Sequence, residues 1–111
     1  MIPPALTQRY DRLRELSAVK DLLSSIEESG LNAENEKQFL SEKIQELQKQ
    51  LDDTAADTQR IIDQLPDSQA QIYASIHYQI GYEWIDIADM FHITVEAAKA
   101  RVYRYLHQLS P

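Results

Sequence analysis

A chain of 111 residues with a net charge of −7 is long enough for one compact domain, or for one domain with an extension. It contains no cysteine, which excludes disulfides and thiolate metal sites and favours a reducing, intracellular setting. Its first residues lack the basic start and apolar run of a secretory signal, and no segment approaches the ~20 apolar residues of a membrane span. We therefore expect a soluble, cytoplasmic protein.

The scarcity of helix breakers predicts an all-α fold. Two glycines and four prolines divide the chain into segments 5–29, 31–65 and 66–110. Residues 1–65 hold 8 basic and 13 acidic side chains, for −5, and residues 66–111 hold 3 and 5, for −2. The acidity therefore lies mostly in the N-terminal part of the chain.

The segment 5–29 has apolar side chains at every third or fourth position, which predicts an amphipathic helix. These side chains are Leu6, Tyr10, Leu13, Leu16, Val19, Leu23 and Ile26. We expect Gly30 to end this helix in the left-handed conformation and Asn32 to cap the next one.

A second helix over residues 33–65 carries side chains with the alternating spacing of four and three that is typical of a seam between paired helices, and Thr54 and Thr58 weaken the middle of this seam. The predicted oligomerisation residues on this seam are Leu40, Ile44, Leu47, Leu51, Ile61 and Leu65. Such a helix is about 50 Å long and needs a partner along its length. Residues 1–65 are therefore expected to form an antiparallel helical hairpin or a coiled coil, supplemented by self-association into a homodimer.

Three shorter helices are expected in residues 66–111. Asp67 or Ser68 is predicted to cap the first, and Gly81 to end it. The first helix has an apolar face made by Ile72, Tyr73, Ile76 and Ile80. The second has Trp84, Ile87, Ala88 and Phe91 on one side. The third, capped by Thr94, has Ala98, Val102, Tyr105, Leu106 and Leu109 on one side.

The second and third of these helices, joined by a turn at residues 91–93, have the layout of a helix-turn-helix. Three-helix units of this size also serve as protein-binding modules, so the layout leaves both functions open. We expect Trp84 to belong to the core. His77, His92 and His107 lack the spacing of a metal site and are expected at the surface or at helix caps.

Residues 77–109 resemble region 4 of bacterial sigma factors, and more closely the short regulators of this type that bacteriophages encode. In that family an Arg-Tyr-x-x-Gly stretch leads into a helix with Trp or Tyr followed by Ile-Ala, then a turn, then a helix with a Lys-x-Arg-x-x-Arg pattern. The corresponding residues here are His77, Tyr78, Gly81, Trp84, Ile87, Ala88, Phe91, His92, Lys99, Arg101 and Arg104. His77, Glu83 and His92 depart from the family's usual Arg, Ser or Thr, and Gly. The resemblance implies a DNA-binding transcriptional regulator, encoded by a phage or mobile element, that lacks the other sigma regions.

On the third helix the core stripe leaves one face for double-stranded DNA. The predicted DNA-binding residues are Thr94, Glu96, Ala97, Lys99, Ala100, Arg101, Tyr103 and Arg104. The two alanines allow close approach, Arg104 is expected to reach a guanine edge, and Lys99 and Arg101 to take phosphates on either side. Tyr103 and His107 are expected to face outward as well. Because three cations are few, a dimer is expected to bind usefully where a monomer does not.

Two other functions fit the same sequence. An acidic inhibitor or adaptor would bind a basic host protein such as a polymerase or a nuclease. The DNA-recognition subunit of a phage packaging enzyme would also combine a helix-turn-helix with an oligomerising helical part. No Gly-rich phosphate loop, activated nucleophile or cluster of metal ligands occurs, so we expect no enzyme activity, no cofactor and no metal.

Overall fold

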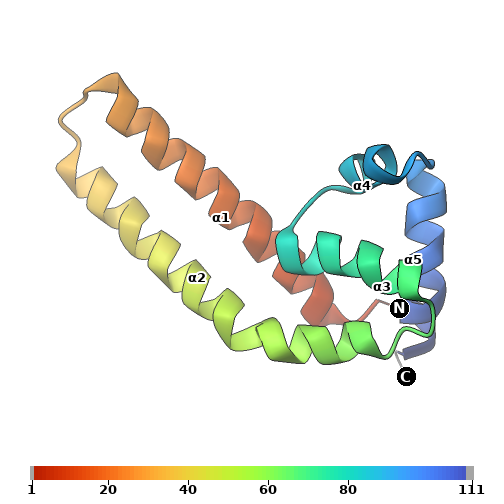
Figure 1. Cartoon of the computed structure of the whole chain (residues 1–111). Coiled ribbons are helices and arrows are strands. Elements are labelled where there is room, and N and C mark those ends of the chain that lie inside the picture. The colour runs from red at the N-terminus through yellow and green to blue at the C-terminus, as the bar shows by residue number, and fades with distance from the viewer. Residues whose placement is uncertain (1, 110–111) are drawn as a thin grey trace.

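The computed structural model describes residues 2–109, and in this part of the chain every regular element is a helix (Figure 1). The elements in chain order are α1 (Pro4–Ser29), α2 (Glu34–Asp63), α3 (Ser68–Ser75), the π-helix η1 (Ile76–Ile80), α4 (Trp84–Phe91) and α5 (Val95–Leu109). The prediction of an all-α fold is confirmed. None of the helices in residues 2–109 is both long and apolar enough to cross a membrane.

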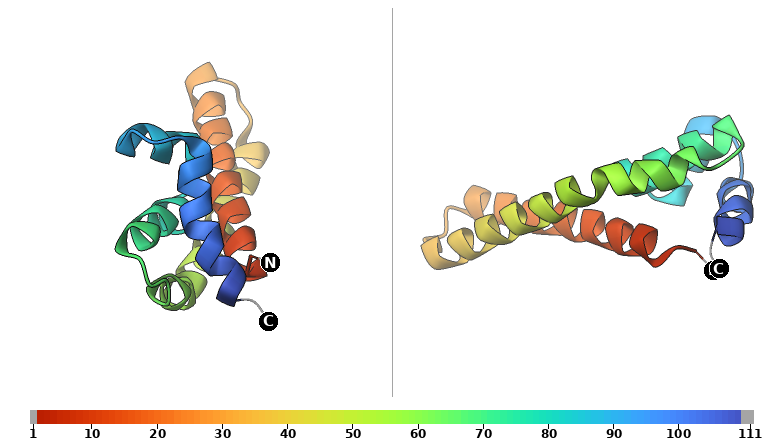
Figure 2. Two further views of the ribbon diagram at one scale, coloured as in Figure 1. Left: turned by 90° about the vertical axis from the view of Figure 1, so that its right-hand side faces the viewer. Right: turned by 90° about the horizontal axis from the view of Figure 1, so that it is seen from below.

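The two long helices α1 and α2 run antiparallel and side by side, and the short helices gather at one end of this pair (Figure 1). The start of α1 and the end of α5 lie close together at that same end (Figure 2). Leu16, Leu47 and Leu51 form a small buried cluster between α1 and α2. Leu13, Val19 and Ile44 pack around it.

The predicted seam of α2 is covered by the same chain. Leu40, Leu47, Leu51 and Leu65 are at most 8% exposed, and Ile44 and Ile61 are half-buried. A homodimer would therefore have to use other surfaces, or displace α1 from α2.

The turn between α1 and α2 follows the prediction at one residue and departs from it at another. Gly30 ends α1 in the left-handed conformation, with φ 72°, as expected. Asn32 does not cap α2, since the helix begins at Glu34 and the preceding residue, Ala33, makes no side-chain cap. The acidic Glu34 and Glu36 in the first turn interact favourably with the positive end of the helix dipole instead.

The segment after α2 is shaped by one cap and one glycine. Asp67 caps α3 as predicted, since its Oδ1 accepts a hydrogen bond of 3.2 Å from the Gln69 amide. Gly81 ends η1 with φ 98°, and a Cβ at this position would lie 3.1 Å from the Leu13 Cβ. The backbone conformation therefore favours glycine, and a Cβ would also make a tight contact with α1. The predicted apolar face is wrong at Ile72 and Ile80, which are exposed.

The main core contains residues from both sides of the predicted domain boundary at residue 66. Its buried side chains are Leu6, Ile62, Leu65, Ala70, Tyr73, Ala74, Tyr78, Trp84, Ile87, Ala98, Val102 and Leu106. Leu6 comes from α1 and Ile62 from the end of α2, so the short helices share one core with the long pair.

Candidate nucleic-acid interface

The helices α4 and α5 pack against each other and are joined by a turn of three residues, His92 to Thr94. His92 adopts the left-handed conformation, with φ 56° and ψ 44°, and the next amide, that of Ile93, donates a hydrogen bond of 3.0 Å to the Ala88 carbonyl. Thr94 then caps α5 as predicted, because its Oγ1 accepts a hydrogen bond of 3.0 Å from the Ala97 amide. These hydrogen bonds fix the position of the first turn of α5 relative to α4.

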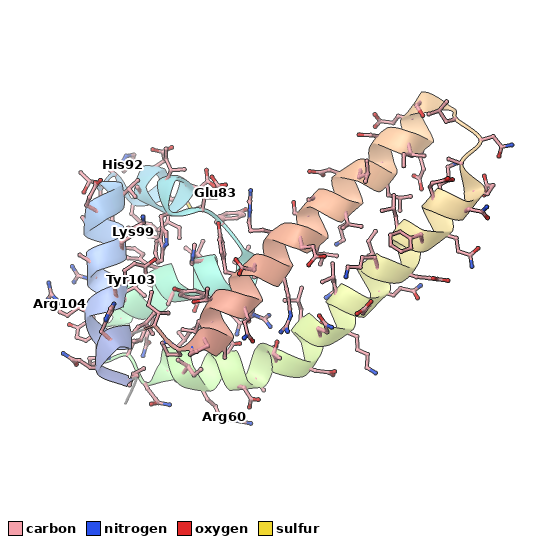
Figure 3. The ribbon with its side chains drawn as sticks, turned by 180° about the vertical axis from the view of Figure 1, so that it is seen from behind. Arg60, Glu83, His92, Lys99, Tyr103 and Arg104 are labelled. Atoms are coloured by element: carbon pink, nitrogen blue, oxygen red, sulfur yellow. The ribbon has the colours of Figure 1, made fainter. Side chains whose placement is uncertain are left out.

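One side of α5 is buried and the opposite side is open. Ala98, Val102 and Leu106 face the core and are fully buried. Six of the predicted contact residues are exposed: Thr94, Glu96, Ala97, Ala100, Arg101 and Arg104. Arg104 points away from the body of the molecule (Figure 3).

The exposed face of α5 is hollowed where its side chains are small. Asp67, Ala97, Ala100, Arg101, Arg104 and Tyr105 line a shallow groove. The small side chains of Ala97 and Ala100 form the floor of the groove. Arg101 and Arg104 supply positive charge along its edge. Such a surface admits another polar molecule close to the helix backbone.

Arg101 does not point freely toward solvent. Its Nε lies 2.6 Å from Oδ2 of Asp67, the residue that caps α3. This hydrogen bond holds the pKa of Asp67 below its ordinary value and raises the pKa of Arg101 above its ordinary value. One of the three predicted cations is therefore neutralised by a partner within the chain.

Lys99 and Tyr103 lie on the side of α5 that faces the other helices (Figure 3). Both are half-buried, and the ring of Tyr103 meets Trp84 edge-on at a centroid distance of 5.7 Å. The prediction that Tyr103 faces outward is therefore corrected, since aromatic packing holds it against the core. Of the three predicted cations, Lys99 is half-buried and Arg101 is paired with Asp67, whereas Arg104 is exposed and points outward.

A stack of three aromatic rings connects α1, η1 and α4. His77 lies between Tyr10 of α1 and Trp84 of α4, with ring centroids 4.0 and 4.1 Å away. Trp84 belongs to the core as predicted, but the expectation that His77 lies at the surface is wrong, because it is 4% exposed. Its Nδ1 donates to the Tyr82 carbonyl at 2.7 Å.

Burial lowers the pKa of His77 to about 4, and the positive charge of Lys99 acts in the same direction while the hydrogen bond to Tyr82 opposes it. The ring is therefore neutral at pH 7 and adds no charge to the interface. His92 and His107 are exposed, as expected.

Acidic side chains border the candidate interface. Glu83, Asp86 and Asp89 are exposed at the start of α4 and along it, and Glu96 is exposed in the first turn of α5. Glu83 is paired with Arg14 of α1 at 3.0 Å. Exposed carboxylates of α4 and α5 thus lie around the exposed arginines of α5.

The residue that sequence reasoning missed is Arg9. It is 5% exposed, and its guanidinium donates to the carbonyls of Tyr78 and Leu51 and to Oγ1 of Thr54, at 2.8, 2.7 and 2.8 Å. A signal was present, because Arg9 falls at helical spacing between Leu6 and Leu13 on the apolar stripe of α1. It ties together α1, α2 and η1, behind the helices that present α5.

Comparison of the sequence with protein-family models and with curated proteins, and of the fold with solved structures, finds no match. Within residues 2–109 no group of three or more His, Asp or Glu side chains is arranged to hold a metal ion.

Proposed function

We propose that this protein is a DNA-binding transcriptional regulator in which α4 and α5 form a helix-turn-helix and α1 and α2 form a helical hairpin that supports it. The observation that carries the proposal is the outer face of α5, where Arg104 stands beside the exposed Ala97 and Ala100. A recognition helix needs such a face to enter the major groove, with small residues for close approach and an arginine for the O6 and N7 atoms of guanine.

The other predicted contacts take supporting roles. Thr94 and the N-terminus of α5 suit a phosphate, because a helix N-terminus carries partial positive charge. Glu96 repels phosphate, but it can accept a hydrogen bond from a cytosine amino group. Lys99 reaches a phosphate from the side of α5 that faces the other helices. Few contacts of this kind give weak binding, so we expect the functional form on DNA to be a homodimer.

Binding of the full chain to double-stranded DNA from upstream of its own and neighbouring genes tests the proposal, measured by fluorescence anisotropy at low salt. Arg104→Ala should weaken binding about tenfold, since a bidentate arginine–guanine contact contributes about 1–3 kcal/mol. Arg60→Ala is the matched control, because it removes one exposed positive charge from α2, away from α5 (Figure 3). No binding, or equal losses in the two variants, would reject the proposal.

Asp67→Asn provides a test with the opposite sign. Asparagine caps helices as well as aspartate does, so α3 is preserved, but Arg101 loses its charged partner. We expect binding to become several-fold tighter and the log–log salt dependence to steepen by about 0.9, the value for one added phosphate contact. An unchanged salt dependence would mean that Arg101 makes no contact with DNA.

The acidic border of the interface favours a second candidate, an adaptor that binds a basic protein such as a polymerase or a nuclease. Asp86 and Asp89 are exposed on α4, on the same unit as α5. Immobilised protein in nuclease-treated lysate of the source cell would then retain one stoichiometric partner, and the Asp86→Asn, Asp89→Asn variant would lose it. Retention by that variant would exclude α4 as the binding surface.

A further inference from the structure

The end of the α1–α2 pair that lies far from α5 carries exposed apolar side chains. Leu22, Ile26, Asn35, Glu36, Phe39 and Leu40 line a groove between the end of α1 and the start of α2, which we call the tip groove. Phe39 is 66% exposed and Leu22 is 51% exposed. The buried cluster between the two helices extends only as far as Val19 and Ile44, so these side chains lie beyond it. Leaving one such side chain in water forgoes about 1.5–3 kcal/mol of burial.

Carboxylates outnumber cations around the tip groove, where Lys20 and Lys37 flank a segment with five acidic residues. Residues 21–36 contain Asp21, Glu27, Glu28, Glu34 and Glu36 and no lysine or arginine. The nearest cation along α2, Lys37, is already paired with Glu34 at 3.6 Å. Of these carboxylates, Glu36 lines the apolar groove, and the others lie in the adjoining end of α1 and in the first turn of α2.

Two of these carboxylates interact unfavourably with the dipole of their own helix. Glu27 and Glu28 stand in the last turn of α1, which has no basic residue, at the negative end of the helix dipole. Each such placement costs about 0.3–1 kcal/mol. A cation brought by a partner would offset this repulsion, whereas the acids at the start of α2 already suit their helix.

We propose that the tip groove docks a basic amphipathic helix of a partner protein. The apolar side of that helix would cover Phe39 and Leu22, and its lysines or arginines would face Glu27, Glu28 and Glu36. Helices commonly bind in this way, with apolar residues at i, i+3, i+4 and i+7 seated in a groove. A symmetric contact with a second copy is disfavoured, because it would bring two sets of five carboxylates together.

The position of the groove gives the interaction a role beyond DNA binding. The molecule is 51 Å long, and the tip groove and α5 lie at opposite ends (Figures 1 and 2). A partner docked at the tip therefore leaves the outer face of α5 open. The α1–α2 pair would hold the partner at a fixed distance from whatever α5 binds.

The test uses the full chain and a fluorescent helical peptide of about 18 residues, with leucine at i, i+3, i+4 and i+7 spacing and lysine elsewhere. A second peptide of the same pattern with glutamate in place of lysine should not bind. Leu22→Ser with Phe39→Ser should weaken binding of the lysine peptide about tenfold, the usual effect of removing central apolar anchors. Ile80→Ser with Ile85→Ser is the matched control at exposed apolar positions near α4, and should change binding less than about twofold.

A charge series separates docking at the tip from general attraction to an acidic protein. Glu27→Gln, Glu28→Gln and Glu36→Gln together should also weaken binding about tenfold. Glu46→Gln, Asp53→Asn and Asp89→Asn remove the same charge at exposed sites outside the groove, and should leave binding within about twofold. Equal losses in the two triple variants, or self-association of the wild type that Phe39→Ser abolishes, would overturn the proposal.

Discussion

Arg9 joins three helices through hydrogen bonds that a neutral side chain of similar length cannot make. Its buried guanidinium donates to main-chain carbonyls of α2 and η1 and to Thr54. Burial lowers the pKa of Arg9, with the charge of Asp52 opposing, but an arginine remains protonated at pH 7. We expect Arg9→Met to lower the free energy of unfolding by about 2–4 kcal/mol, because charged hydrogen bonds are lost in a buried setting.

Urea unfolding followed by circular dichroism measures this loss. Arg14→Met on the same helix is the control, since Arg14 makes an exposed ion pair with Glu83 that contributes at most about 1 kcal/mol. Similar losses in both variants would show that the contacts of Arg9 are not what stabilises this junction.

Titration of His77 makes the free energy of unfolding depend on pH at values where carboxylates stay charged. Its pKa is about 4 in the folded chain against an ordinary value of 6.5. The unfolded chain therefore binds this proton more readily, and stability falls as the pH drops from 6.5 toward 4. From pH 7 to pH 5 the free energy of unfolding should fall by about 2 kcal/mol.

Urea unfolding at several pH values between 5 and 7 checks this dependence. His77→Gln keeps an amide that can donate to the Tyr82 carbonyl but removes the titrating group, so its stability should vary much less over this range. An equal slope in both proteins would assign the pH dependence to other groups.

Single residues were predictable where their role is local. Asp67, Thr94 and Gly30 act on amides or turns within a few positions of themselves, and each does what the sequence predicts. Arg9, His77 and the partner of Arg101 depend on residues distant in the chain, which no local pattern reveals. Arg101 meets Asp67 across 34 positions, and Arg9 meets Tyr78 across 69.

The α-helices were predictable in order, whereas the π-helix η1 was not predicted, and the buried face was predicted wrongly at Ile72 in α3 and at Ile80 in η1. The buried face of α3 and η1 consists of Ala70, Tyr73, Ala74, His77 and Tyr78, a regular stripe that includes two small residues and a histidine. The predicted face shared Tyr73 with this stripe and otherwise consisted of isoleucines. Because η1 is a π-helix with a wider turn, Ile80 does not lie above Ile76 as it would in an α-helix.

The end of α4 carries a local strain that can be relieved. His92 has φ 56°, a conformation that costs an L-residue about 1–2 kcal/mol and that glycine adopts readily. His92→Gly should therefore stabilise the protein by about 0.5–1 kcal/mol, after allowance for the greater freedom of glycine in the unfolded chain. Thermal unfolding measures the gain. His92→Val should lower the melting temperature instead, and a gain with valine would contradict the argument.

At the scale of the whole molecule, the periodicity of α1 and α2 predicted that each needs a partner, but not which surfaces would meet. The structure pairs the two helices with each other and inserts the ends of both into the core under α3, α4 and α5. Sequence patterns identify apolar faces, whereas the choice between an internal and an external partner depends on chain connectivity and on the close approach at Gly81.

The shared core predicts that the chain unfolds as one unit. Leu6 of α1 is fully buried in the same cluster as Trp84, which is the single tryptophan of the chain. Leu6→Ala should lower the free energy of unfolding by about 2–5 kcal/mol and shift tryptophan fluorescence and circular dichroism together to lower urea. Leu22→Ala, at an exposed position of the same helix, should change it by less than about 0.5 kcal/mol. If residues 66–111 were stable alone, the fluorescence transition would stay in place while the signal from the long helices moved.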